Sequence, residues 1–509
     1  MVVLEIEKNT LENYNLHKYI NDVEEYGLKD TWNKICDYIL LNGESEFLNT
    51  KNFGKMYEVG LATVNKEQKK TRGQYYTPDD VAAVMSEWLR GLEGDNICDI
   101  ACGTGQLILT YLDLIERNEA EKILSEGRLY LYDTDKVALK VCRTAICVKF
   151  GIKYLNKINI VHCDFLDKTI TLPKNSKVIS NPPYAAIKTV NENWEKSDVI
   201  DTTKEFYAAF MEKILLQSKS AVIISPFSFI SGRRFYPLRK IMNNKSGEIY
   251  SFDNVPGNIF RGKKHGIFNT NLANSVRAAI TVIKSNEKET GFRLTPLIRF
   301  KSAERKDLLK CSVLEKMLSA KVQKVSQDNK KYFKCHPKLL NIFEEWIKSD
   351  KTIKDYIAKD GKYELYLPDT CRYYTTASDK KLSRNGQIKL TFNDKDVFNF
   401  MYCFINSSFA YWYWRLYDGA ILYPKSLLLK VPVFFDKLTE KDKQFFKKTS
   451  EEMIKSAKNF KTTKNNVGLQ ENIRYPKEYR DKINQYLLNL LGINSDCSVF
   501  DVIHSNTAL

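Results

Sequence analysis

Short apolar runs alternate with helical stretches over residues 72–285 of this 509-residue chain. Nearly every position in these runs is apolar, as in strands whose two faces are both buried. Buried strands separated by helices predict an α/β fold with a mostly parallel sheet. The predicted strands cover residues 96–100, 129–133, 158–164, 176–184, 221–226 and 277–283.

Different patterns flank this region on both sides. Residues 1–70 carry apolar positions at helical spacing, with a first helical stretch that ends at Gly43. After about residue 290 the chain becomes rich in Lys, Tyr, Phe and Asn, and strand-like and helical pieces mix. We therefore predict an N-terminal helical region over 1–70, an α/β domain over 71–290 and a mixed α+β domain over 291–509, with the boundary within 287–295.

The positive charge of the chain is concentrated in its second part. The net charge is +17, yet residues 1–290 hold 39 Lys and Arg against 37 Asp and Glu. Residues 291–509 hold 40 against 25. This asymmetry indicates either a polyanionic partner that binds the C-terminal part or a solvated basic surface, and charge alone does not decide between them.

Composition also bears on the cellular location of the protein and on its thiol and metal chemistry. No apolar run approaches twenty residues, and the N-terminus lacks the pattern of a secretion signal, so we expect a cytoplasmic protein without a membrane partner. The eleven cysteines are scattered and form no Cys-x-x-Cys pair, so we expect reduced thiols and no metal site.

A glycine-rich turn follows the first predicted strand. Residues 99–105 read Asp-Ile-Ala-Cys-Gly-Thr-Gly and precede a helical stretch. Glycines let the backbone approach a ligand closely, and a strand–turn–helix unit of this kind is a common site for a nucleotide-like cofactor. The spacing differs from the dinucleotide pattern and disfavours NAD. A tight turn without a ligand is the alternative.

Acidic residues end the next two strands. Asp133 could accept hydrogen bonds from two ribose hydroxyls or could cap a helix, and Asp135 is the better candidate for the cap. Asp164 could accept an adenine amino proton while Phe165 packs on the base, although a turn Asp beside a core Phe gives the same pattern. Three acidic residues at three successive strand ends make a nucleoside-binding edge the better interpretation.

The most specific motif is Asn181-Pro182-Pro183-Tyr184, directly after the strand that ends with Val-Ile-Ser. Two prolines fix the backbone and remove two N–H donors, so a carbonyl acceptor is held rigidly beside the Asn amide. Two acceptors can bind both N–H groups of an amino substituent and localise the nitrogen lone pair for attack on a methyl donor. Tyr184 could stack on a flat base. A plain Asx-Pro turn is the alternative.

The order of these motifs resembles that of the γ-type N6-adenine DNA methyltransferases of restriction–modification systems, a family that includes type I modification subunits and type II adenine enzymes. In that family a Gly-x-Tyr-Phe-Thr-Pro segment, an Asp-Pro-Ala-Cys-Gly-Thr-Gly turn, an acidic residue, an Asp-Phe/Leu turn and Asn-Pro-Pro-Tyr/Phe follow one another. Here they correspond to GQYYTP at 73–78, DIACGTG at 99–105, Asp133, Asp164-Phe165 and NPPY at 181–184. Ile100 replaces the usual Pro.

The resemblance implies a Rossmann-like S-adenosylmethionine-dependent methyltransferase domain with a mostly parallel sheet, and it implies a role for each motif residue. The methionine part of S-adenosylmethionine would contact Tyr76, Thr77, Pro78, Asp99, Ala101, Gly103 and Gly105. Asp133 would bind the ribose, and Asp164 with Phe165 the adenine. Asn181, Pro182, Pro183 and Tyr184 would hold the amino group of a flipped target adenine. Phe260 and Phe268 are both candidates to stack on its far face, and each could equally be a core residue.

By the same resemblance, residues 291–509 would form a DNA-recognition domain. Its candidate contacts to phosphates or guanine edges are Arg372, Lys380, Lys381 and Arg384, which could also be ordinary surface charges. The segment 404–433 resembles a recurring piece of such recognition domains, and the spacing of the aromatics at 411–414 favours core positions.

We therefore expect a sequence-specific DNA adenine-N6 methyltransferase that binds double-stranded DNA and works with a separate restriction endonuclease or specificity subunit, or alone. Methylation of an RNA adenine or of a protein glutamine by the same Asn-Pro-Pro-Tyr chemistry is the alternative. N4-cytosine enzymes mostly carry Ser in place of Asn181. A DNA-binding protein that uses the fold only as a scaffold is a third, non-enzymatic possibility.

Overall fold

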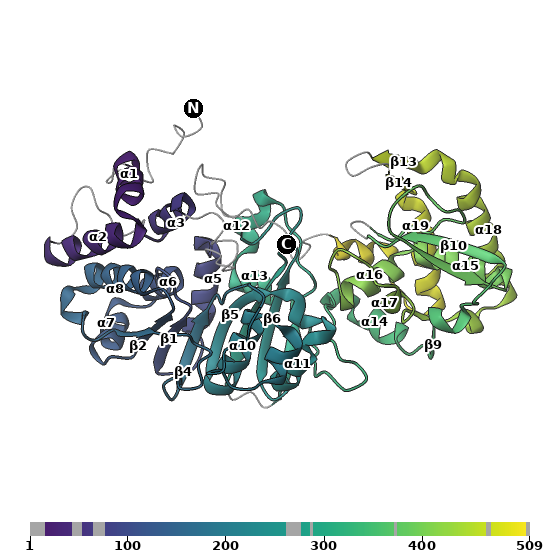
Figure 1. The fold of residues 1–509 in the computed structure, drawn as a ribbon. Coiled ribbons are helices and arrows are strands. Elements are labelled where there is room, and N and C mark those ends of the chain that lie inside the picture. Colours follow the sequence, from purple (N-terminus) through teal and green to yellow (C-terminus); the bar gives the residue numbers. More distant parts are fainter. Residues whose placement is uncertain are drawn as a thin grey trace. The chain divides into compact units, whose positions relative to one another are not determined.

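The computed structural model describes residues 16–42, 53–64, 77–260, 276–285, 289–370, 374–464 and 470–504 (Figure 1). The chain divides into two compact units, of which the first extends to Tyr332 and the second begins at Phe333. Both the N-terminal helices and residues 291–332 belong to the first unit, whereas we predicted a boundary within 287–295 and a separate region over 1–70. The difference arises because strand β8 (Gly291–Leu294) pairs with the main sheet.

The first unit is built around one sheet with the strand order β3-β2-β1-β4-β5-β7-β6-β8. The first five strands in this order run parallel, β7 is antiparallel to both its neighbours, and β8 is parallel to β6. This confirms the predicted mostly parallel sheet. The strands other than β8 are β1 (Asn96–Ile100), β2 (Leu129–Asp133), β3 (Asn159–His162), β4 (Ser176–Ser180), β5 (Ser220–Pro226), β6 (Ser246–Phe252) and β7 (Ala278–Lys284).

Helices cover both faces of this sheet, and each face has its own core. Alternate residues of β1 show the division, because Ile97 joins the core on one face whereas Cys98 and Ile100 join the core on the other. The first core contains α5 (Asp79–Arg90), α6 (Gln106–Leu114), α7 (Arg117–Ser125), α8 (Lys136–Phe150), α12 (Arg305–Leu308) and α13 (Cys311–Glu315). The second contains α9 (Asp198–Thr203), α10 (Phe206–Gln217) and α11 (Tyr236–Met242).

A further layer of N-terminal helices packs on α8. The helices α1 (Leu16–Tyr26), α2 (Leu28–Asn42) and α3 (Phe53–Val64) surround the fully buried Trp32, whose indole N–H donates to the Tyr19 hydroxyl at 2.9 Å. The outer side of α8, including Val141, belongs to this third core, while its inner side, including Cys142, faces the sheet. Figure 1 shows this layer on the side of α8 away from the strands. The predicted helical character is confirmed.

The second unit is a mixed α+β structure, as predicted. Its core includes the aromatic stretch Tyr411–Trp414, which confirms that these side chains are core residues. Helices and paired strands are α14 (Leu340–Trp346), α15 (Lys395–Asn406), α16 (Ser408–Tyr417), α17 (Lys425–Leu428), α18 (Glu440–Ser456), α19 (Lys477–Leu490), β9 (Lys351–Thr352) with β12 (Pro432–Val433), β10 (Tyr363–Pro368) with β11 (Gln387–Phe392), and β13 (Lys461–Lys464) with β14 (Gln470–Ile473). Across the described residues, no helix has the length and apolar character needed to cross a bilayer.

Candidate active site

The predicted site residues gather where the strand order reverses. The chain places β2 on one side of β1 and β4 on the other, and ligands of such sheets bind in the crevice outside the carboxyl ends of the strands. Here the crevice is a cavity of about 1160 Å³ formed within the first unit. Its wall includes the predicted residues Thr77, Ala101, Gly103, Asp133, Asp164, Phe165, Asn181 and Pro183.

The turn after β1 has an unusual backbone. Ala101, Gly103 and Gly105 all have positive φ, at 58°, 53° and 90°. A Cβ on Gly105 would lie 2.4 Å from the Cys142 sulfur of α8, so this position requires glycine for space as well as for conformation. Because Gly105 is the N-cap of α6, the turn places the first residue of that helix, Gln106, on the cavity wall.

Asp99 lies in β1 directly before this turn and is completely buried. One carboxylate oxygen accepts a hydrogen bond from the Ile108 N–H at 3.2 Å, and the other has no hydrogen-bond partner among the described residues. Burial raises the pKa of Asp99 well above its usual range, and the negative charge of Asp133 adds to the effect. The side chain does not line the cavity wall.

Asp133 ends β2 and holds the glycine-rich turn. Its two oxygens accept the backbone N–H groups of Gly103, at 2.7 Å, and of Asp135, at 2.8 Å. Since each carboxylate oxygen can accept two hydrogen bonds, capacity for hydroxyl donors remains. Burial raises the pKa of Asp133. Asp135 accepts the N–H groups of Val137 and Ala138 and thereby caps α8, which confirms the predicted cap.

Asp164 and Phe165 follow β3. One oxygen of Asp164 accepts the Leu166 N–H at 3.0 Å, and the other accepts the Trp194 indole N–H at 2.7 Å. Phe165 is almost entirely buried and meets Tyr132 edge to face, with the ring centroids 5.9 Å apart. Trp194 also lines the cavity. The sequence offered no signal for it, because its contact with Asp164 depends on the path of the irregular segment after β4.

Asn181 follows the last residue of β4. Its side-chain NH₂ donates to the Thr77 hydroxyl at 3.0 Å, so the Thr-Pro segment before α5 meets the Asn-Pro-Pro-Tyr segment at the cavity. The Ser180 hydroxyl donates to the Ile100 carbonyl at 2.7 Å and holds the ends of β4 and β1 together. Pro183 lines the cavity, whereas Pro182 and Tyr184 are not part of its wall.

Tyr184 forms an aromatic pair with Phe260. Their ring centroids are 5.7 Å apart with an interplanar angle of 65°, and the Tyr184 hydroxyl donates to the Ile224 carbonyl of β5 at 3.2 Å. Phe260 is 2% exposed and belongs to the core of its face, so its stacking on a base stays a prediction. Pro78 is the N-cap of α5. Tyr76 and Phe268 lie outside the described residues.

Comparison with known families assigns the chain. The sequence profile described as "N-6 DNA Methylase" matches residues 49–328, which is more than half of the chain. This protein belongs to the N-6 DNA methylase family. The matched range contains all the cavity segments that follow β1, β2, β3 and β4, as well as the segment that carries Phe260.

Individual relatives match shorter stretches. The chain is 26% identical over 133 residues to the type I restriction enzyme MjaIX methylase subunit of Methanocaldococcus jannaschii, covering 26% of this chain and 22% of the relative. It is 25% identical over 144 residues to the MpnII methylase subunit of Mycoplasma pneumoniae, covering 26% and 25%. These matches thus span about a quarter of each relative. The solved type I restriction enzyme EcoKI M protein shares 11% identity at a TM-score of 0.34, over 68% of this chain and 75% of that one.

In this N-6 DNA methylase, the N-terminal helices also contribute to the cavity wall. Lys29, Asp30 and Asn33 of α2 line it, together with Tyr57 and Leu61 of α3. The Tyr57 hydroxyl donates to Asp135 at 2.6 Å, which ties α3 to the start of α8. Sequence reasoning missed these residues, because an amphipathic pattern marks the buried side of a helix without saying which element it packs on.

The four basic candidates of the second unit differ in their surroundings. Lys380 and Lys381 are exposed. Arg384 is half-buried, donates to the Thr370 hydroxyl at 2.9 Å and also bonds Asn472, so it holds its own unit together. Arg372 lies outside the described residues. Contacts of any of these side chains with nucleic acid stay a prediction.

Proposed function

We propose that this protein is an S-adenosylmethionine-dependent DNA methyltransferase that modifies the N6 amino group of a flipped adenine in a specific sequence. The observation that carries the proposal is the position of Asn181. Its amide lies on the wall of the same cavity as the glycine-rich turn and Asp133, and Thr77 fixes its rotation. Membership of the N-6 DNA methylase family supports the same conclusion.

The residues around the cavity fit S-adenosylmethionine. Asp99 does not line the cavity, but its buried carboxylate lies directly before the turn, so a positively charged group held over the turn would stabilise its negative charge. Asp133 keeps acceptor capacity for ribose hydroxyls. Asp164 and Phe165 offer an acceptor and a flat apolar wall for the adenine ring. When bound, the cofactor supplies a methyl group activated by a positively charged sulfur.

The chain's own residues would then prepare the attacking nitrogen. The Asn181 side-chain oxygen and the Pro182 carbonyl would each accept a hydrogen bond from one N–H group of the adenine amino group. Accepting both hydrogen bonds would localise the lone pair on N6 and prepare this nitrogen to take the methyl group that the cofactor would supply from its sulfur. N6 then loses one proton to solvent. The Thr77 hydroxyl contributes by holding the Asn181 amide in one orientation before the base arrives.

Double-stranded DNA is the proposed substrate, and the cytoplasm the proposed location. The excess of positive charge lies in residues 291–509, where it suits a phosphate backbone. The two relatives above are named as methylase subunits of type I restriction enzymes, which supports a restriction–modification context. A specificity subunit or a restriction endonuclease would complete such a system.

The test is methylation of unmodified genomic DNA by the purified full-length chain with S-adenosylmethionine, read by sequencing for N6-methyladenine. We expect the mark in one sequence context. Asn181→Ala should lower turnover by on the order of 10²-fold or more, as for loss of one preorganised hydrogen-bonding group at a reacting centre. Asn244→Ala, which changes an exposed Asn, is the matched control and should retain turnover.

Binding of labelled S-adenosylmethionine and circular dichroism show that each variant is folded. A folded wild-type protein that binds the cofactor but marks no DNA in any context contradicts the proposal. RNA and glutamine-containing peptides, offered in parallel, would then identify the alternative acceptors. Wild-type turnover by Asn181→Ala would contradict the proposed role of the amide.

A further inference from the structure

Arg305 lies outside every motif and joins two parts of the site. It is the first residue of α12 and is 9% exposed. Its guanidinium binds the Asp80 carboxylate of α5 through Nε at 2.5 Å and Nη2 at 2.8 Å. The same group donates to the carbonyls of Asn258, at 2.9 Å, and Ile259, at 2.8 Å. One side chain thus bridges α5 and the segment after β6.

The α5 end of this bridge adjoins the cofactor and base-binding residues. Asp80 is three residues from Thr77, which accepts the Asn181 hydrogen bond. Its neighbour Asp79 accepts the Gln106 side-chain N–H at 2.9 Å, and Gln106 begins the helix that follows the glycine-rich turn. The first residues of α5 therefore connect the ends of β4 and β1, and Arg305 is attached to this connection.

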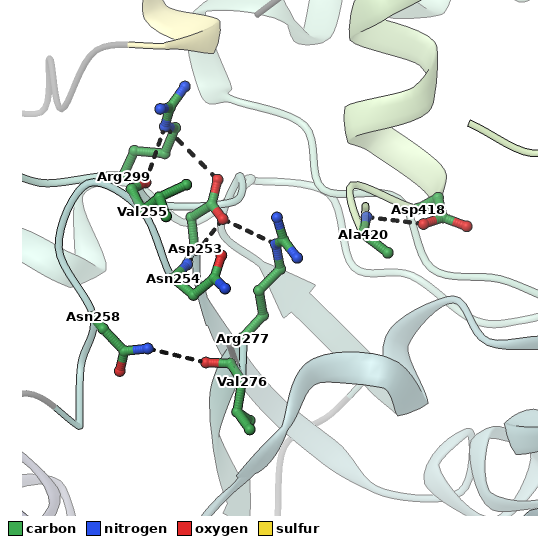
Figure 2. A network of polar contacts seen from close by, with 9 residues as sticks. All are labelled: Asp253, Asn254, Val255, Asn258, Val276, Arg277, Arg299, Asp418 and Ala420. Carbon is green, nitrogen blue, oxygen red and sulfur yellow. Dashed lines mark hydrogen bonds and ion pairs between the residues drawn. The ribbon is translucent and has the colours of Figure 1, made fainter. Parts of the chain in front are cut away.

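The other end of the bridge adjoins the aromatic pair. The Phe260 N–H donates to the Asn258 side-chain oxygen at 2.8 Å, and the Phe260 ring meets Tyr184. Figure 2 shows further polar contacts of the same segment. There Arg277 donates to Asp253 at 2.9 Å, and the Asn258 amide donates to the Val276 carbonyl at 3.4 Å.

We propose that Arg305 is a positioning residue that holds the Tyr184–Phe260 pair in a fixed position relative to Asn181 and the glycine-rich turn. The proposal rests on the proposed function for its catalytic consequence. A guanidinium can bind a carboxylate bidentately and still reach two carbonyls with its remaining N–H groups, whereas a lysine ammonium cannot span the same partners. Arg305 acts through these neighbours. Loss of the Arg305 side chain should therefore weaken binding of the flipped base more than binding of the cofactor.

The test compares Arg305→Met and Arg305→Lys with Arg239→Met. Arg239 is the matched control because it is also a buried arginine that donates to backbone carbonyls, those of Phe229, Gly232 and Lys330, but in the core of the opposite face. Turnover, S-adenosylmethionine affinity and the fluorescence of 2-aminopurine placed at the target adenine are measured for folded protein.

For Arg305→Met we expect turnover to fall by on the order of 10²-fold, as for an ångström-scale misplacement of reacting groups. The fluorescence rise on DNA binding should disappear, and cofactor affinity should be unchanged. Arg305→Lys should fall between Arg305→Met and the wild type, and it replaces Arg305→Met if that variant does not fold. Arg239→Met should keep the fluorescence rise. Equal loss in Arg239→Met, or wild-type turnover in both Arg305 variants, overturns the proposal.

Hydrogen exchange tests the bridge without any substrate. The N–H groups of Gly257 and Phe260 are hydrogen-bonded, to the Phe300 carbonyl at 2.7 Å and to the Asn258 side chain at 2.8 Å. Exchange at these amides and near Asp80 should accelerate in the Arg305 variants and not in Arg239→Met. Unchanged exchange overturns the positioning role. If the wild type methylates no DNA, the proposed function fails, and this exchange result alone still decides the role of Arg305.

Discussion

Acidic side chains near the carboxyl ends of β1, β2 and β3 differ in the donors that surround them. Both oxygens of Asp133 and both of Asp164 accept hydrogen bonds from the protein, and those contacts shape the turn and hold Trp194. Asp99 has one such donor and is completely buried. The protein therefore carries a carboxylate with one unsatisfied oxygen directly before its glycine-rich turn. This costs stability in the cofactor-free protein and favours a ligand that brings positive charge close to the turn.

Asp99→Asn should stabilise the cofactor-free protein at neutral and higher pH. The folded pKa of Asp99 is raised, so the folded state holds the proton more tightly than the unfolded chain. Stability of the wild type therefore falls as pH rises from the unfolded pKa, about 3.9, through the folded pKa. An uncharged amide avoids this loss of stability, so the difference between the two proteins should grow as pH rises.

Thermal unfolding of both proteins between pH 4 and pH 8 measures the difference. The gain in Tm of Asp99→Asn should be largest at pH 8 and should shrink toward pH 4. The S-adenosylmethionine affinity of Asp99→Asn should be lower than that of the wild type at all pH values above 4. Parallel stability curves for the two proteins would show that the buried carboxylate is matched in solution. Unchanged cofactor affinity would separate Asp99 from the binding site.

At the scale of elements, strands β1 and β2 could be predicted with the bounds they have, because their runs are apolar and buried on both faces. β6 was missed because Ser246, Gly247 and Glu248 break its apolar run. The structure buries Glu248 by pairing it with Lys284, at 2.8 Å, and with Arg293. Ion pairs between strands that are distant in sequence leave no periodic signal, so this burial could not be predicted from the pattern.

The site could be predicted only where its residues are local in sequence. The motif segments follow consecutive strands, and a parallel sheet brings the carboxyl ends of its strands to one edge. Tyr57, Trp194 and Arg305 reach the same site from elements whose packing the pattern does not specify. The local motifs therefore indicated the chemistry. The remaining wall of the cavity and the Arg305 bridge could be identified only from the tertiary structure.

The N-cap of the short helix η7 (Pro337–Leu339), His336, should make the stability of the second unit depend on pH. His336 accepts the Lys338 N–H at 3.2 Å, and burial, with a smaller effect of the Lys338 charge, lowers the pKa of His336 to about 4. Below pH 6.5 the unfolded chain binds a proton that the folded one does not. Stability of the second unit should thus fall as pH drops from 6.5 to about 4, by a total of about 3 kcal/mol.

Calorimetry of the full chain over this pH range resolves the unfolding transition of the second unit. His336→Asn keeps an acceptor at the cap but removes the titration, so its transition should depend less steeply on pH. If the two proteins lose stability at the same rate between pH 6.5 and pH 4, His336 is not the group that links protons to folding of this unit.

At the scale of the whole molecule, the chemistry lies in one unit and the excess positive charge in both. The first unit contains the cavity and the motif residues, and its last part, residues 291–332, holds 11 Lys and Arg against 4 Asp and Glu, whereas residues 333–509 hold 29 against 21. A phosphate backbone would therefore be attracted to residues of both units, and base chemistry would occur in the first. Lys380 and Lys381 are the exposed members of the predicted contact set, while Arg384 is engaged within its own unit.

Lys380→Ala combined with Lys381→Ala should weaken DNA binding and lower its dependence on salt. Removing one lysine–phosphate interaction reduces the slope of log affinity against log salt by about 0.9, so removing two lowers it by about 1.8. The matched control is Lys153→Ala combined with Lys157→Ala, an exposed pair in the segment before β3, away from the carboxyl edge of the sheet.

Titrations of labelled duplex DNA at several salt concentrations give both slopes. If the two pairs reduce the slope equally, net charge alone explains DNA binding, and a slope unchanged in both removes Lys380 and Lys381 from the interface. A reduction confined to Lys380 and Lys381 would assign the polyanion contact to the second unit, because the two double variants change the net charge by the same amount and differ only in where they remove it.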